Sequence, residues 1–213
     1  MQKIEQVQTK EYIAGILRNE ILSGGLKPGQ ELAQEKLAEL LGVSRMPVRE
    51  ALQTLAAEGF LERMPNRHMK VIELDERQVQ ESFFFLAQAE QTVFRILRKQ
   101  AETEENGMKE VSGIFTLLDG KGAESAGERE LAFHLQALQL LDNAYIRQIC
   151  GRLLQGYAAF VLKELPGEEP VLLRSMKEPW MADQQEKVTA ILEEYYKNLA
   201  ERLLLHWREN INE

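Results

Sequence analysis

The segment from Gly42 to Leu55, GVSRMPVREALQTL, constrains the fold of this chain more than any other stretch. Its apolar residues recur at helical spacing and form one stripe: Val48, Ala51, Leu52 and Leu55. We expect the Ser44 hydroxyl to cap the helix N-terminus, and Pro47 fits the first turn. Arg45 and Arg49 share the opposite face. The segment therefore predicts the second helix of a helix-turn-helix, with two guanidinium groups placed to read a major groove.

The flanking sequence predicts the rest of a winged helix. Apolar spacing and turn signals predict helices over residues 9–23 and 34–41 and strands over residues 60–64 and 69–72. Gly42 ends the second helix, and Pro65 to His68 form a tight connection between the strands. Three helices and a β-hairpin thus make up a winged helix-turn-helix domain over residues 1–74.

From Asp75 onward the apolar pattern is helical throughout. The predicted helices cover residues 76–102, 108–118, 127–141, 145–165, 184–196 and 199–210. We therefore expect a mainly α protein, in which the winged helix-turn-helix domain is followed by an all-α helical bundle over residues 75–213.

The formal net charge of −8 is unevenly distributed. Residues 1–74 carry ten basic and ten acidic residues, whereas residues 75–213 carry sixteen basic and twenty-four acidic residues. A neutral N-terminal domain can still bind phosphates if its basic groups lie on one face. The acidic excess in the second part therefore does not exclude nucleic acid binding by the first.

Composition also bounds the compartment. Cys150 is the single cysteine, which excludes an internal disulfide and fits a reducing environment. No apolar run approaches the roughly 18 residues of a membrane span, and the N-terminal sequence lacks the apolar core of a signal peptide. We expect a cytoplasmic protein without membrane association.

Three segments resemble the GntR family of bacterial transcriptional regulators: residues 21–32, 37–52 and 58–61. The resemblance covers about residues 10–72. The helical remainder, with the sequence ELAFH from Glu130 to His134, looks like the FadR-type ligand-binding half, called the FCD domain. The resemblance implies a homodimeric, sequence-specific transcriptional regulator, expected to be a repressor. It would bind a palindromic double-stranded operator and respond to a small-molecule effector held in the helical domain.

The same resemblance implies which residues contact DNA. On the recognition helix they are Ser44, Arg45, Met46 and Arg49, and on the wing they are Asn66, Arg67 and His68. An arginine that binds guanine O6 and N7 contributes about 1–3 kcal/mol of discrimination. The family wing usually carries glycine at its tip, where this chain has Pro65 and Asn66.

The helical part carries an incomplete set of metal ligands. Metal-binding members of the FCD class use an aspartate and a histidine four residues apart, with two later histidines. Here Glu130, His134 and His206 are present, but Gln184 or Gln185 stands where a histidine is expected. Glutamine is a weak ligand for zinc or nickel. Two hypotheses follow: a divalent metal, zinc or nickel, held by the first three residues, or a metal-free effector pocket lined by all five.

Residues 83–86, FFFL, also bear on the effector. Many relatives carry an arginine one turn before the position of Glu90, and Leu86 replaces it here. This change favours an apolar or mixed ligand over a small dicarboxylate. Three consecutive phenylalanines cannot share one helix face, so at least one must contact a different surface from the others.

Two other classes of function compete with a ligand-controlled regulator. A ligand-independent dimeric DNA-binding protein could retain the helical domain for dimerisation alone. A metal-dependent enzyme would use Glu130, His134 and His206, but no second carboxylate motif supports that chemistry. We therefore expect no enzymatic activity.

Overall fold

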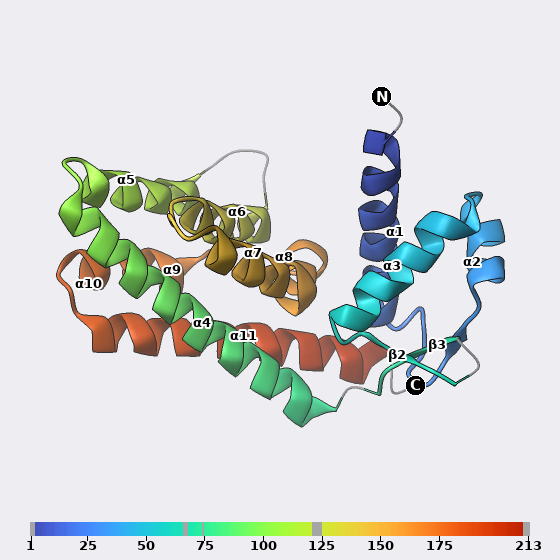
Figure 1. The fold of residues 1–213 in the computed structure, drawn as a ribbon. Coiled ribbons are helices and arrows are strands. Elements are labelled where there is room, and N and C mark those ends of the chain that lie inside the picture. Colours follow the sequence, from blue (N-terminus) through green and yellow to red (C-terminus); the bar gives the residue numbers. More distant parts are fainter. Residues whose placement is uncertain (1–2, 66–67, 74, 121–124, 211–213) are drawn as a thin grey trace. The chain divides into compact units, whose positions relative to one another are not determined.

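The computed structural model describes residues 3–65, 68–73, 75–120 and 125–210, which form two compact units (Figure 1). The first unit is Met1–Asp75 with His206–Glu213, and the second is Glu76–Leu205. The end of the last helix thus groups with the N-terminal unit, whereas the sequence assigned all of residues 75–213 to the helical bundle. The Trp207 indole N–H donates to the Leu22 carbonyl oxygen at 2.8 Å, which ties that helix end to the first unit.

The first unit is a winged helix. Its helices are α1 (Lys3–Ser23), α2 (Gln34–Leu41) and α3 (Arg45–Ala57), and its strands are β1 (Glu31–Leu32), β2 (Leu61–Arg63) and β3 (Met69–Val71). The strands form one antiparallel sheet in the order β1-β3-β2. Strand β1 was not predicted, because two residues are too short to show an alternating pattern. The predicted three helices and hairpin are otherwise present.

Helix α3 packs across α1, as Figure 1 shows. Ile13 and Leu17 on α1 and Leu52 and Leu55 on α3 are at most 3% exposed. Burying an aliphatic side chain contributes about 1.5–3 kcal/mol, so this contact fixes the orientation of α3. At the far end of α3 the Arg18 guanidinium donates to both carboxylate oxygens of Glu58, at 2.7 to 3.1 Å.

The second unit is helical throughout the part of it that the structure describes. Its elements are α4 (Glu76–Thr103), α5 (Gly107–Ile114), the 3₁₀ segment η1 (Phe115–Asp119), α6 (Ala126–Gln139), α7 (Ala144–Leu153), the π-helical segment η2 (Leu154–Ala158), α8 (Ala159–Glu164), α9 (Val171–Ser175), α10 (Lys177–Met181) and α11 (Gln185–Asn210). Helices α4 and α11 are the two longest of these. None of the described helices is long and apolar enough to cross a membrane.

Several predicted helix boundaries were wrong, and two of them concern whether a helix is continuous. The helix predicted over residues 145–165 is divided at η2, where Gly156 has the non-helical angles φ −81° and ψ −121°. The predicted break between residues 196 and 199 is absent, since α11 runs uninterrupted. Neither Lys197 nor Asn198 breaks a helix, and buried Tyr196 and Leu199 keep the helical spacing across them.

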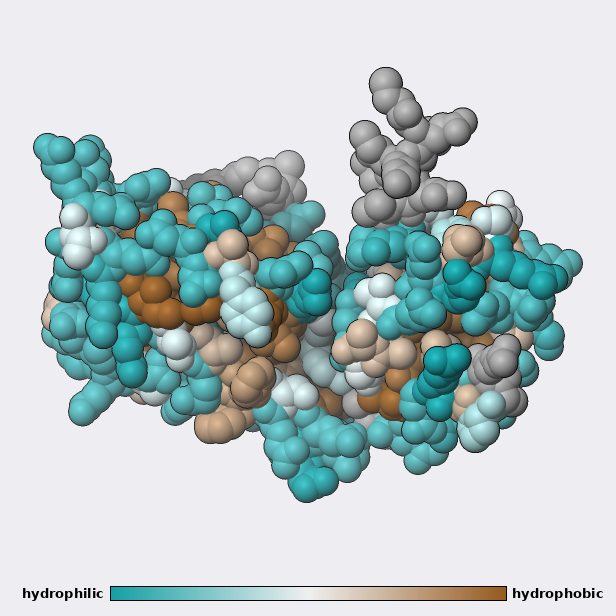
Figure 2. Space-filling model, in the orientation of Figure 1, coloured by the Kyte–Doolittle hydropathy of each residue, from teal (hydrophilic) through white to brown (hydrophobic). Residues whose placement is uncertain are grey.

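The three consecutive phenylalanines of α4 do contact different surroundings. Phe83 is buried at 1% exposure, and its ring lies 6.4 Å from that of Tyr196. Phe84 and Phe85 are 61% and 59% exposed. Figure 2 shows patches of hydrophobic surface on the face of the second unit that is in view. Helix α4 therefore buries one face in the bundle and leaves a second, aromatic face exposed.

Candidate DNA interface and interior polar site

The turn between α2 and α3 depends on one glycine. Gly42 has φ +64°, a left-handed conformation that side chains other than glycine disfavour. The N–H of Val43 then bonds the carbonyl oxygen of Ala38 at 3.0 Å, closing the end of α2. This tight turn sets the short separation between α2 and the recognition helix.

Ser44 occupies the N-cap position of α3, with φ −72° and ψ 160°, but its side chain makes no capping hydrogen bond. The predicted capping role of the hydroxyl is therefore wrong, because the backbone adopts the cap conformation without it. Ser44 is exposed, so its hydroxyl is accessible to a ligand such as a phosphate.

The predicted base-reading side chains lie on the exposed face of α3. Arg45 is 71% exposed and forms an ion pair of 3.3 Å with Glu35 on α2. The Arg49 guanidinium donates to the Met46 sulfur at 3.0 Å, and Met46 is 49% exposed. The opposite face of the helix is buried: Pro47, Val48, Ala51, Leu52 and Leu55. One helix thus combines a buried apolar face with an exposed basic face at its N-terminal end.

The wing is a short antiparallel hairpin. The N–H of Met64 bonds the His68 carbonyl oxygen at 2.9 Å, next to the pairing of Arg63 with Met69. His68 is exposed, and its Nδ1 lies 3.3 Å from a carboxylate oxygen of Glu31. The other two predicted wing contacts, Asn66 and Arg67, lie outside the described residues.

In the second unit, His134 is the centre of a buried polar cluster formed with Glu90, Glu130, Tyr195 and Tyr196. All five residues are at most 5% exposed. His134 Nδ1 lies 2.5 Å from Glu90 Oε1, and Nε2 lies 3.0 Å from the Tyr195 hydroxyl. The Tyr196 hydroxyl donates to Glu90 Oε2 at 3.0 Å. Helices α4, α6 and α11 each contribute to the cluster.

The proton positions in this cluster follow from its donors and acceptors. Since Glu90 accepts from Tyr196 at Oε2, Nδ1 of His134 donates to Oε1, and Nε2 of the ring pairs with the Tyr195 hydroxyl. Burial raises the pKa of Glu130, although its hydrogen bond to Tyr195 opposes this shift. Burial likewise holds the pKa values of Tyr195 and Tyr196 well above 10. The Tyr195 hydroxyl bonds the Glu130 carboxyl group as well as the ring of His134, so each group in the cluster has a partner.

Within the second unit, the two glutamines of the predicted effector or metal pocket lie away from His134. Both ring nitrogens of His134 are engaged by Glu90 and Tyr195. Gln185 lies ten residues before Tyr195 on α11, about 15 Å along the helix axis. Gln184, directly before it, is exposed, and His206 belongs to the first unit.

Within the described part of the chain, no three histidine, cysteine, aspartate or glutamate side chains are placed to hold a metal ion. This donor set therefore does not fit zinc or nickel, which prefer several nitrogen or carboxylate ligands around one point.

Sequence reasoning missed the tyrosines and gave Glu90 no role in this cluster. Their signal was available: Glu90 falls on the apolar face of α4 between Ala87 and Val93, where an acidic residue requires partners. Tyr195 and Tyr196 resemble ordinary core aromatics in the sequence, and only the fold brings their hydroxyls to the carboxylates.

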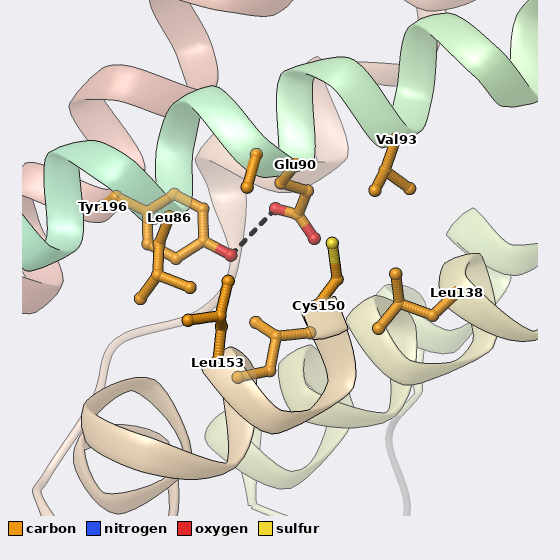
Figure 3. Close-up of a pocket in the computed structure, with 9 residues that line it drawn as sticks. Leu86, Glu90, Val93, Leu138, Cys150, Leu153 and Tyr196 are labelled. Atoms are coloured by element: carbon orange, nitrogen blue, oxygen red, sulfur yellow. Dashed lines mark hydrogen bonds between the residues drawn. The ribbon is translucent and has the colours of Figure 1, made fainter. Parts of the chain in front are cut away.

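A pocket adjoins this cluster (Figure 3). Leu86 and Val93 of α4, Leu138 of α6 and Leu153 of α7 provide apolar walls. Glu90 adds a polar group, and Cys150, Tyr196 and two further residues complete the lining. The space has a volume of about 230 Å³, including the part open to solvent. Burial raises the pKa of the Cys150 thiol, which therefore remains protonated at neutral pH.

The first unit, with its exposed basic recognition helix, buried apolar face and hairpin wing, defines the class of winged helix-turn-helix DNA-binding domains. Residues 9–71 match the family described as bacterial regulatory proteins, gntR family. The N-terminal domain of this chain belongs to that family.

Curated relatives extend the similarity beyond the DNA-binding domain. The gluconate operon transcriptional repressor of Bacillus subtilis is 29% identical over 164 residues, covering 75% of this chain and 66% of the relative. The regulator Mce2R of Mycobacterium tuberculosis is 31% identical over 161 residues, covering 67% of this chain and 58% of the relative. The chain thus spans just under two thirds of the length of the repressor.

A solved structure shares the whole fold. The structure of E. coli McbR/YncC superposes with a TM-score of 0.56 and 20% sequence identity, covering 93% of this chain and 98% of that one. At this identity the likeness concerns the fold: a winged helix-turn-helix followed by a helical domain.

Proposed function

We propose that this protein is a sequence-specific transcriptional regulator, expected to be a repressor, that binds DNA through α3. The observation that carries the proposal is the exposed N-terminal end of α3, where Arg45 and Arg49 project opposite a fully buried face. The match of residues 9–71 to the gntR family supports the same assignment. We propose Ser44 and Met46 as further contacts on α3, and Asn66, Arg67 and His68 as contacts from the wing.

Footprinting on an operator selected from random duplexes tests this proposal. Arg45→Ala or Arg49→Ala should abolish the specific footprint. Arg77→Ala is the matched control, because Arg77 is equally exposed at 74% but lies on α4 in the second unit. Retained footprints in both α3 variants would overturn the assignment of the recognition helix.

We further propose that the helical unit dimerises and so presents two winged helices to a palindromic operator. Exposed apolar side chains support this role: Phe84 and Phe85 on α4, and Tyr145 and Ile149 on the neighbouring α7. Exposed aromatic side chains are enriched at protein interfaces. Phe84→Glu should shift the sedimentation coefficient from dimer to monomer, and a monomeric wild-type protein would refute the proposal.

Effector control is the remaining part of the proposed function. Helix α11 contributes Tyr196 to the pocket in the second unit, while its final residues, from His206 onward, belong to the first unit. A ligand that favours one placement of α11 can therefore change operator affinity, provided that it binds two states of the protein unequally. A ligand-independent regulator would show the same operator affinity with every metabolite tested.

An enzymatic role has little support. The curated relatives above carry the names of transcriptional regulators. The cluster around His134 offers neither a metal site nor an exposed nucleophile, since its five side chains are buried and bonded to one another.

A further inference from the structure

The two ring nitrogens of His134 have different kinds of partner. Nδ1 lies 2.5 Å from Glu90 Oε1, and Nε2 lies 3.0 Å from the Tyr195 hydroxyl. A histidine that binds a metal through one ring nitrogen almost always donates its other N–H to a carboxylate, a carbonyl or water. Glu90 therefore orients the ring of His134 as a carboxylate orients a metal-binding histidine, with Nε2 directed at one point inside the second unit.

The Tyr195 hydroxyl lies at that point. It bonds the carboxyl group of Glu130 as well as Nε2 of His134. Glu130 and His134 are four residues apart on α6 and share one face of that helix, whereas Tyr195 comes from α11. A carboxyl group and an imidazole at this helical spacing are a pair that can hold one metal ion, and here they hold one hydroxyl group instead.

We propose that the Tyr195 hydroxyl takes the place of a metal ion in this site, and that the side chain at position 195 decides whether Glu130 and His134 bind a metal. The proposal goes beyond the DNA-binding role proposed above and does not depend on it.

The hydroxyl leaves no room for an ion. Metal–nitrogen bonds are about 2.0–2.1 Å long, so an ion on Nε2 of His134 would overlap an oxygen atom held at 3.0 Å from the same nitrogen. The Tyr195 ring is fixed by its neighbours: it lies 5.3 Å from the ring of His134 and 5.1 Å from that of Tyr196. Leu192 and Leu199, which flank it on the same face of α11, are 0% and 2% exposed.

The hydroxyl also does the structural work of a bridging ion. It joins α11 to α6, as an ion joins ligands from different helices. A second bond, from the Tyr196 hydroxyl to Glu90 Oε2 at 3.0 Å, joins α11 to α4, as Figure 3 shows. Three helices are thus connected through side chains alone, and the second unit should keep its fold without a metal.

One substitution should reverse this choice. A histidine side chain ends roughly 2 Å short of the position of the tyrosine hydroxyl, which is about the length of a metal–nitrogen bond. In Tyr195→His, an ion at the former hydroxyl position would therefore have the new imidazole, His134 and Glu130 around it. Two histidines and one carboxylate are a ligand set that holds zinc or cobalt, with water completing the coordination. Glu90 and Glu130 supply two negative charges, which balance a divalent ion in a buried site.

Cobalt(II) absorption in the visible range tests the proposal on the full-length protein, because four-coordinate cobalt absorbs more strongly than the hydrated ion. We expect Tyr195→His to bind about one cobalt ion per chain, at least about a hundredfold more tightly than the wild type. Tyr195→Phe is the matched control, because it removes the hydroxyl and adds no metal ligand. Adding His134→Ala to Tyr195→His should abolish the gain, which locates the ion at this site.

Two results would overturn the proposal. One is stoichiometric cobalt binding by the wild type that is lost in His134→Ala, since the hydroxyl would then not block the site. The other is equal cobalt binding by folded Tyr195→His and Tyr195→Phe. If Tyr195→His does not fold, Tyr195→Ala with free imidazole supplies the same ligand, and absence of bound cobalt there also counts against the proposal. No DNA takes part in these measurements, so their failure is distinguishable from a failure of the proposed function.

Discussion

Replacing His134 by leucine should destabilise the second unit by about 3 kcal/mol. The substitution removes one hydrogen bond to the Glu90 carboxylate, which is 5% exposed, and one to the Tyr195 hydroxyl. A hydrogen bond to a charged group contributes about 1.5–3 kcal/mol, and a neutral one contributes about 1 kcal/mol. The apolar surface of leucine offsets part of this loss, because the position is fully buried.

Calorimetric unfolding of the full chain measures the effect. For a protein of this size, 3 kcal/mol corresponds to a fall in the unfolding temperature of roughly 6–12 °C. His68→Leu, the same substitution at an exposed position, should change stability by less than about 0.5 kcal/mol. A chelator should leave the wild-type transition unchanged. Unchanged stability of His134→Leu, or a chelator effect as large as the mutation, would refute the account of a metal-free cluster.

Three other interactions lead to further testable outcomes. Burial raises the folded pKa of Glu130 above its unfolded value of about 4.5, so the wild-type protein should lose stability as the pH rises through the folded pKa. Glu130→Gln should remove this loss. If urea titrations of the wild type and the variant show the same dependence of stability on pH, the assignment is contradicted. Glu35→Gln removes the ion-pair partner of Arg45 and should tighten operator binding about two- to fivefold, as measured by fluorescence anisotropy. Weaker binding would show instead that the ion pair positions Arg45 for DNA. Trp207→Phe removes the hydrogen bond to the Leu22 carbonyl. It should reduce the effect of a pocket ligand on operator affinity without changing the affinity of that ligand for the pocket. If the effect on operator affinity is unchanged, this contact takes no part in the coupling between ligand binding and operator binding.

The DNA-binding domain was predictable because its information is local. Gly42, the apolar stripe from Val48 to Leu55 and the two arginines occupy one continuous segment, and helix α2 was predicted with the bounds that the structure has. Ser44 shows where local rules fail, since its cap conformation does not require its side chain.

The interior site was less predictable because it is assembled from residues far apart in the chain. Glu90 and Tyr196 are 106 positions apart, and no spacing rule connects them. The sequence correctly predicted Glu130 and His134 as neighbours on one helix face. It could not show that both ring nitrogens of His134 already have partners, which argues against the expected metal. The division of α7 from α8 at Gly156 was missed for a similar reason, because glycine alone does not show whether a helix tolerates it.

The central claim is that the arginines of α3 read guanine in an operator. The most direct measurement uses selected operator duplexes in which each guanine in turn is replaced by 7-deazaguanine, which lacks the N7 acceptor. The affinities of the wild-type, Arg45→Ala and Arg49→Ala proteins for these duplexes are compared. We predict that the wild-type protein loses about tenfold to a hundredfold in affinity at one or more positions, and that one arginine variant shows no further loss there. If no guanine replacement weakens the wild-type protein, or if both variants respond as the wild type does at every position, α3 does not read the operator through these arginines.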